Sequence, residues 1–74
     1  MYRENFFQKI KAARTDAGYT QREVAELTGI SQSIIAYIET GKREPSIENL
    51  CKLIDFYEVS ADWILGTGKR IEKA

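Results

Sequence analysis

The chain has 74 residues, with 11 cationic and 11 anionic side chains and no histidine. A chain this short folds as one small domain with one modest core, too small for a catalytic domain with a separate cofactor lobe. Its 43% hydrophobic and 30% charged content, with a single proline, is typical of an ordered, helix-rich domain and excludes a disordered tail. The zero net charge gives no bulk attraction to nucleic acid or membranes, so any basic surface must be local.

Several other classes of protein are excluded by what the sequence lacks. No apolar run approaches the about 18 residues of a membrane span, and MYRENFF lacks the apolar region of a signal peptide; we expect a cytoplasmic protein with no membrane partner. Cys51 is the only cysteine, expected to be buried, and without histidine no usual metal site can form. GTGK lacks the upstream glycine and the following Ser or Thr of a phosphate-binding loop. We therefore expect no enzyme, no metal and no cofactor.

Helical periodicity predicts a first helix over residues 4–17, ended by Gly18. The pattern TQRE, which begins at Thr20, predicts a capping box at the start of a second helix, worth about 1 kcal/mol. Gly29 ends this helix, whose apolar side is expected to comprise Val24, Ala25 and Leu27.

Three more helices follow. Ser31 is the expected N-cap of a third helix that stops at Gly41, and Ser46 the N-cap of a fourth, after Pro45. Ser60 is expected to cap a short fifth helix, ADWIL. The apolar stripe of the fourth helix is expected to comprise Ile47, Leu50, Leu53, Ile54 and Tyr57.

The second and third helices are too short to be stable alone, and the turn that joins them contains a glycine. This combination is typical of a helix-turn-helix unit, here over residues 20–40. TQREVAELTGISQSIIAYIETGKREPS, followed by a helix and VSADWILG, resembles the DNA-binding domain of the Cro and phage-repressor (XRE-type) regulators, from about Phe6 to Gly66. The residues that carry the resemblance are Gln21, Ala25, Gly29, Ile35, Ile38, Glu39, Gly41, Pro45 and Ser46.

The resemblance implies an all-α, compact five-helix bundle of the lambda-repressor-like type. It assigns residues 1–66 to the DNA-binding domain, with residues 31–40 as the recognition helix that enters the major groove. The charged segment 67–74 is expected to be a flexible tail or linker.

A helical wheel separates two faces of the third helix. At about 100° per residue, Ile38 lies near Ile35, while Ser33 and Tyr37 point the opposite way and Ile34 lies on a flank, where it can either complete the core or press on a thymine methyl group. Long charged side chains are usual on a purely structural helix, whereas small ones let the backbone approach a groove. The expected outward face contains Gln32, Ser33, Ala36, Tyr37 and Thr40.

Four of these residues have chemistry suited to base edges. The carboxamide of Gln32 can pair with the N6 and N7 edge of adenine, for about 1–3 kcal/mol of discrimination. Ser33 can donate or accept at a base edge, Ala36 can touch a thymine methyl, and Tyr37 can stack on sugar or donate to a base or phosphate. The alternative for each is an ordinary exposed residue.

Phosphate contacts are expected from cations close to the recognition helix. Lys42 and Arg43 follow it directly, and Arg22 projects from the start of the second helix. By resemblance, Gln21 lies beside Gln32 and either steadies its amide or contacts phosphate. About four phosphates per subunit would make affinity fall steeply with salt, although a basic loop can also serve solubility alone.

By the same resemblance, Arg14 and Glu39 form a partly buried structural ion pair. Breaking one side would cost about 3–5 kcal/mol if burial is substantial. On sequence alone they could equally be two unconnected surface charges.

Large apolar side chains near the C-terminal end indicate a partner surface. Tyr57 and Trp63 fit the core stripe, whereas Phe56 and Ile64 lie off it. We expect Phe56, Trp63 and Ile64 to form a homodimer interface that places two recognition helices about 34 Å apart on a palindrome.

The sequence therefore predicts a sequence-specific, dimeric DNA-binding regulator of a prokaryote, phage or mobile element, nucleoid-associated and most simply a repressor that occludes a promoter. The alternative is a protein-interaction module or antitoxin-type protein with the same fold.

Overall fold

The computed structural model describes residues 6–65. This part of the chain has an all-α fold, as predicted. Residues 4 and 5 of the expected first helix, and the expected tail over 67–74, lie outside the described part. No helix within residues 6–65 is long and apolar enough to cross a membrane. The five helices are α1 (Phe6–Ala17), α2 (Gln21–Thr28), α3 (Gln32–Glu39), α4 (Ile47–Tyr57) and α5 (Ala61–Leu65).

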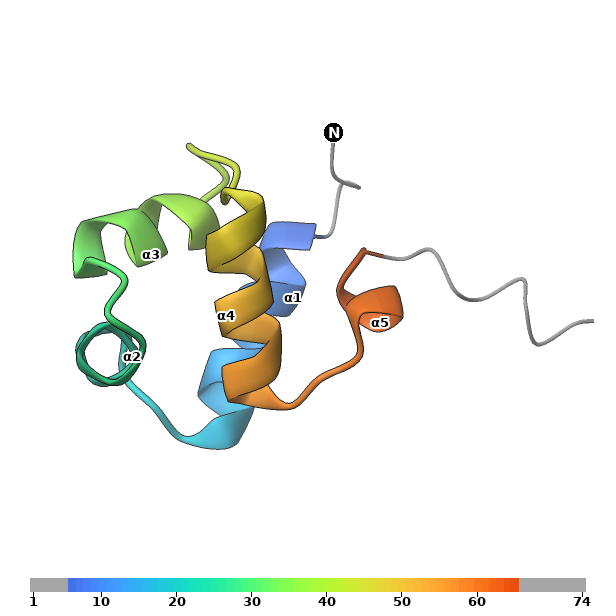
Figure 1. Cartoon of the computed structure of the whole chain (residues 1–74), viewed down its shortest axis with the longest axis horizontal. Helices are drawn as coiled ribbons and strands as arrows, with labels where there is room; N and C mark the ends of the chain where they lie inside the picture. Colours follow the sequence, from blue (N-terminus) through green and yellow to red (C-terminus); the bar gives the residue numbers. More distant parts are fainter. Residues whose placement is uncertain (1–5, 66–74) are drawn as a thin grey trace, which may run out of the picture.

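The helices form a bundle with α1 and α4 at its centre (Figure 1). The pair α2 and α3 packs on one side of this centre, and α5 lies on the other side against α1. α3 contacts both α2 and α1. The helix-turn-helix unit is thus supported from behind by the first helix.

Side-chain caps determine where four of the helices begin. Thr20 Oγ1 accepts from the backbone of Glu23 at 3.1 Å, and the Glu23 carboxylate accepts from the Thr20 backbone at 2.8 Å. This is the predicted capping box, and it satisfies two N–H groups that the helix itself leaves unpaired. The predicted caps Ser31, Ser46 and Ser60 begin α3, α4 and α5. Each hydroxyl oxygen accepts one hydrogen bond, from the amides of Ile34, Asn49 and Trp63 in turn.

The core is small and mostly aliphatic. The anchoring role predicted for Ile35 and Ile38 is confirmed, because they are 1% and 0% exposed. Full burial of each such side chain contributes about 1.5–3 kcal/mol. The other fully buried large side chains are Phe6, Ile10, Val24, Leu53 and Ile64.

Three expectations about burial were wrong. Leu50, Leu53 and Tyr57 fix the buried direction of α4, and at about 100° per residue Ile47 and Cys51 turn about 90° and 130° away from it. Accordingly Ile47 is 71% exposed and Cys51 is exposed. Leu27, expected on the apolar side of α2, is 62% exposed because it lies in the last turn, beside a groove that opens toward α4.

Two glycines with similar backbones meet different surroundings. Gly29 and Gly41 have φ values of 82° and 80°, in the left-handed region that strains other residues. A Cβ added at Gly29 meets nothing within 4 Å, whereas one at Gly41 lies 3.1 Å from the Phe7 ring. Gly41 therefore permits close packing of the loop after α3 on α1.

We expect Gly41→Ala to destabilise the protein more than Gly29→Ala. Both variants pay about 1–2 kcal/mol for the left-handed backbone, and only Gly41→Ala also displaces Phe7. Urea denaturation of the two variants gives the difference directly. Equal losses would show that the Phe7 ring moves aside at no cost.

Candidate nucleic-acid interface

The outward face of α3 is polar and largely open. Gln32, Ser33 and Thr40 are exposed, Tyr37 is 45% exposed and Ala36 is half-buried. None of these side chains bears a charge, so the surface has hydrogen-bonding groups and little bulk. As predicted, this outward face is separate from the buried side of α3 that contains Ile35 and Ile38.

Backbone hydrogen bonds hold the basic loop at the end of α3. The amides of Lys42 and Arg43 both donate to the carbonyl of Tyr37, at 2.9 and 3.3 Å. The Thr40 hydroxyl donates to the same carbonyl at 3.2 Å. The exposed cationic side chains of Lys42 and Arg43 therefore start from a fixed position next to the outward face.

Ile34 lies between the core and the surface. It is half-buried and packs against the core cluster. It also lines an open groove of about 430 Å³ between the flank of α3 and the start of α4. Sequence reasoning did not single out Asn49 of this groove, whose other lining residues are Arg43, Glu44, Pro45 and Ser46.

A buried carboxylate ties together three helices behind this face. The Glu39 side chain, 1% exposed, accepts from Arg14 Nε at 2.8 Å and from Arg14 Nη2 at 3.0 Å. The third nitrogen, Arg14 Nη1, donates to the carbonyl of Tyr19 at 2.8 Å. Arg14 and Glu39 are thus a bidentate ion pair and not separate surface charges. Hydrogen bonding to Glu39 raises the pKa of Arg14 above its usual value, against the opposing effect of burial.

Gln21 belongs to the same network. Its amide nitrogen donates to Glu39 Oε1 at 3.0 Å, so the first residue of α2 is bonded to the last residue of α3. The resemblance had placed Gln21 beside Gln32, where it would steady that amide or contact phosphate, and the bond to Glu39 was not predicted. Arg22 is 78% exposed and lies 3.4 Å from Glu26, which is an exposed pair of small energetic value.

The Tyr57 hydroxyl lies near this ion pair, and within residues 6–65 it has no hydrogen-bond partner, although the residue is only 8% exposed. Burial, and then the negative charge of Glu39, raise the pKa of Tyr57 to about 12, against the opposing charge of Arg14. A buried hydroxyl without a hydrogen-bond partner destabilises the folded state, because it loses its bonds to water and gains none in exchange. Tyr57 contributes to the core through its ring, which packs edge-on to Phe56 with centroids 5.5 Å apart.

The three residues expected at a homodimer interface have different surroundings. Ile64 is 1% exposed in the core of a single chain, so its assignment to a surface was wrong: α5 turns this side chain inward. Trp63, expected in the core stripe, is instead 43% exposed, with Lys9 Nζ over its ring at 5.6 Å. Phe56 is half-buried, 5.0 Å from the Tyr19 ring.

No group of three or more His, Cys, Asp or Glu side chains among residues 6–65 is arranged to hold a metal ion. The site consists instead of an outward polar helix, a fixed basic loop and a short preceding helix. These elements define a helix-turn-helix protein.

The comparisons with known proteins agree with this class. The "Helix-turn-helix" family profile matches residues 10–64. The chain is 41% identical over 59 residues to the HTH-type transcriptional regulator ImmR of Bacillus subtilis, and 40% identical over 62 residues to the uncharacterized HTH-type transcriptional regulator YazB of the same organism. The chain belongs to the XRE-type helix-turn-helix family of DNA-binding transcriptional regulators, which are not enzymes.

The extent of the match differs between relatives. The matched region is 80% of this chain but 46% of ImmR, whereas it is 84% of this chain and 90% of YazB. A prophage-derived regulator of Bacillus subtilis, YonR, is 37% identical over 81% of this chain and 56% of its own length. The chain therefore spans about half the length of ImmR and YonR.

We expect single replacements in the buried ion pair to be costly. Glu39→Gln or Arg14→Met each leaves one charge buried without its partner, which should lower the free energy of unfolding by about 3–5 kcal/mol. The double variant should lose less than the sum of the two single losses. Urea denaturation of the four proteins measures the coupling, and additive losses would contradict the pairing.

Tyr57→Phe removes the unpaired hydroxyl and should leave stability at neutral pH unchanged or higher. Because the pKa of Tyr57 rises from 10.0 to about 12 on folding, the unfolded chain ionises first. The wild type should keep its full stability below about pH 10 and lose it as the pH rises toward 12, by about 1.4 kcal/mol per pH unit. Denaturation of both proteins at pH 9 and pH 11 isolates the effect, and parallel losses would contradict it.

Proposed function

We propose that this chain binds double-stranded DNA in a sequence-specific manner, as a homodimer on a palindromic operator, and acts as a transcriptional repressor. The observation that carries the proposal is the face of α3, where exposed Gln32, Ser33 and Tyr37 adjoin the fixed loop with Lys42 and Arg43. Family membership supports the same reading.

α3 is the element suited to the major groove. Its uncharged outward face lets the helix backbone approach base edges closely. In this proposal Gln32 reads adenine through its carboxamide. Ser33, Ala36 and Tyr37 make the remaining contacts to base edges and thymine methyl groups.

The phosphates on either side of the groove are contacted by the basic loop and by α2. Lys42 and Arg43 supply charge next to the C-terminal end of α3. Arg22 supplies it at the N-terminal end of α2, where free amides also favour an anion. Gln21 uses one amide hydrogen on Glu39, which leaves its second for phosphate.

Dimerisation uses the α5 side of the bundle, with exposed Trp63 at its centre. Large aromatic side chains of this kind are enriched at protein interfaces. Two recognition helices related by a two-fold axis then read half-sites one helical turn of DNA apart. A dimer seated over a promoter represses by occlusion.

The test is selection of bound sites from random duplex DNA, followed by measurement of affinity at several salt concentrations. We expect a palindrome with adenine in each half-site, a requirement that Gln32→Ala should relax. Lys42→Ala/Arg43→Ala should weaken binding to all sequences and make the salt dependence shallower by about two phosphate contacts.

The charge-matched control is Lys11→Ala/Lys52→Ala, which removes two exposed cations from α1 and α4. Its affinity and salt dependence should stay near those of the wild type. Failure to enrich any motif, or an equal effect of the control, would contradict sequence-specific recognition by this face. A motif without two-fold symmetry would contradict the dimer.

A further inference from the structure

A lysine of α1 contacts α5 at two points. Lys9 Nζ donates to the backbone carbonyl of Trp63 at 2.8 Å, and it lies over the Trp63 ring at 5.6 Å from the centroid. Both contacts come from one side chain, which reaches a residue 54 positions further along the chain. Lys9 thus constrains both the backbone of Trp63 and the direction of its ring.

α5 depends on contacts from outside itself. It has five residues, too few for a helix that is stable alone. Ser60 caps its start by accepting from the Trp63 amide at 3.2 Å, and Ile64 attaches its inner side to the core. The last carbonyls of a helix lack partners within it, and a lysine can supply the missing donor. Lys9 supplies this donor at the end of α5.

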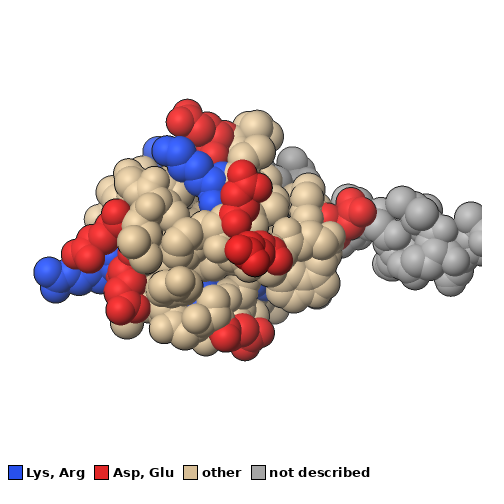
Figure 2. Space-filling view, turned by 60° about the horizontal axis from the view of Figure 1, so that its bottom comes forward, with Lys and Arg blue, Asp and Glu red and all other residues tan. Residues whose placement is uncertain are grey.

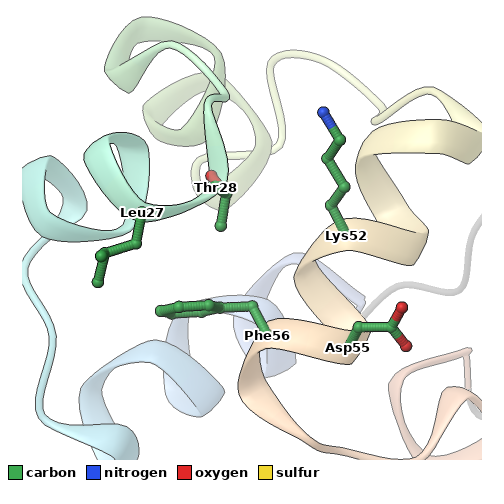
Figure 3. Close-up of a pocket in the computed structure, with 5 residues that line it drawn as sticks. All are labelled: Leu27, Thr28, Lys52, Asp55 and Phe56. Atoms are coloured by element: carbon green, nitrogen blue, oxygen red, sulfur yellow. The ribbon is translucent and has the colours of Figure 1, made fainter.

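Trp63 is the large exposed side chain of α5. It is the only tryptophan of the chain and is 43% exposed. Phe56 does not extend this surface, because it lines the groove between α2 and α4 and is directed toward Leu27 across it (Figure 3). α5 therefore presents one large aromatic anchor, and the fit of a partner on this side depends on where that ring points.

We propose that Lys9 is a positioning residue for dimerisation, which holds the Trp63 ring in the orientation that packs against a second copy of this chain. This inference rests on the proposed function, in which Trp63 lies at the centre of the dimer interface. A free tryptophan side chain loses rotamer freedom when a partner covers it, and this loss opposes association. A ring already held by an ammonium group loses less. The attraction between ammonium and ring also increases when a partner excludes water from them.

Lys9 influences DNA binding only through the dimer. α5 packs against α1, on the opposite side of the central pair α1 and α4 from α2 and α3 (Figure 1). A single subunit should therefore bind an isolated half-site equally well with or without Lys9. An effect of Lys9 should appear only on the full palindrome, where the two subunits bind together.

The test is sedimentation of the full chain over a series of concentrations, for the wild type and three variants. We expect Trp63→Ala to weaken association at least about tenfold. Lys9→Met keeps the apolar stem but removes the charge and the donor, and it should weaken association about three- to tenfold. Lys9→Arg keeps both the charge and the donor, and it should restore most of the loss.

Fluorescence reports on the contact itself. Because Trp63 is the only tryptophan, tryptophan emission from the chain comes from this residue alone. In the monomer at low concentration, Lys9→Met should shift the emission and make Trp63 more accessible to acrylamide, whereas Lys9→Arg should keep the wild-type values. A lysine that only stabilised the fold would leave the emission of the folded monomer unchanged, and this result would overturn the inference.

The control for charge is Lys11→Met, which changes an exposed lysine of the same helix. The chain has equal numbers of cations and anions, so each Lys→Met change leaves one net negative charge. Acidic side chains already outnumber basic ones on the face shown in Figure 2, and added negative charge opposes association by repulsion. Lys11→Met makes the same charge change and should keep association and emission near the wild-type values.

Three further outcomes separate this inference from the proposed function. If Trp63→Ala is impaired and Lys9→Met associates like the wild type, the inference is overturned and the dimer stands. An equal loss in Lys11→Met, or weaker binding of Lys9→Met to an isolated half-site, would also overturn it. A wild type that stays monomeric, or that associates no better than Trp63→Ala, would overturn the proposed dimer and this inference together.

Discussion

The arrangement of the first three helices depends on one buried charge. A carboxylate placed in the interior costs several kcal/mol unless donors surround it, and Glu39 receives three donated hydrogen bonds from Arg14 and Gln21. Because these donors come from α1 and α2, any rotation of α3 that moved Glu39 would leave an unpaired charge. The network thus specifies one orientation, a constraint that the nondirectional packing of Ile35 and Ile38 alone cannot impose.

Because α3 is anchored from inside, the folding of the domain does not depend on the residues of its outward face. Its exposed residues make no contacts that the core needs, so their identities can follow the requirements of a partner. The same holds for the loop after α3, whose path is set by backbone bonds to the Tyr37 carbonyl and by close packing at Gly41 on Phe7. Side chains at Lys42 and Arg43 can change without altering that path.

Local signals predicted the helices well. The capping box at Thr20, the caps at Ser31 and Ser46 and the spacing of Ile35 and Ile38 all depend on neighbours within one or two turns. The errors at Ile64 and Trp63 concern a helix whose orientation depends on distant elements. α5 has five residues, too few for a stripe to show which side is buried. Ile64 was therefore assigned to the surface, and Trp63 was fitted to the core stripe. The bond from Gln21 to Glu39 was likewise invisible to local periodicity.

The separation of charges on this neutral chain has an electrostatic consequence of its own. Lys42 and Arg43 lie on the loop after α3, while α2 and α4, with the cap residue Glu58, carry five anionic and two cationic side chains. A neutral body whose cations and anions are unevenly distributed has a dipole. In the field of a polyanion it experiences a torque and almost no net pull. Electrostatic attraction would therefore not speed the approach of the protein to a polyanion from a distance. The dipole would, however, orient the protein before the two molecules make contact.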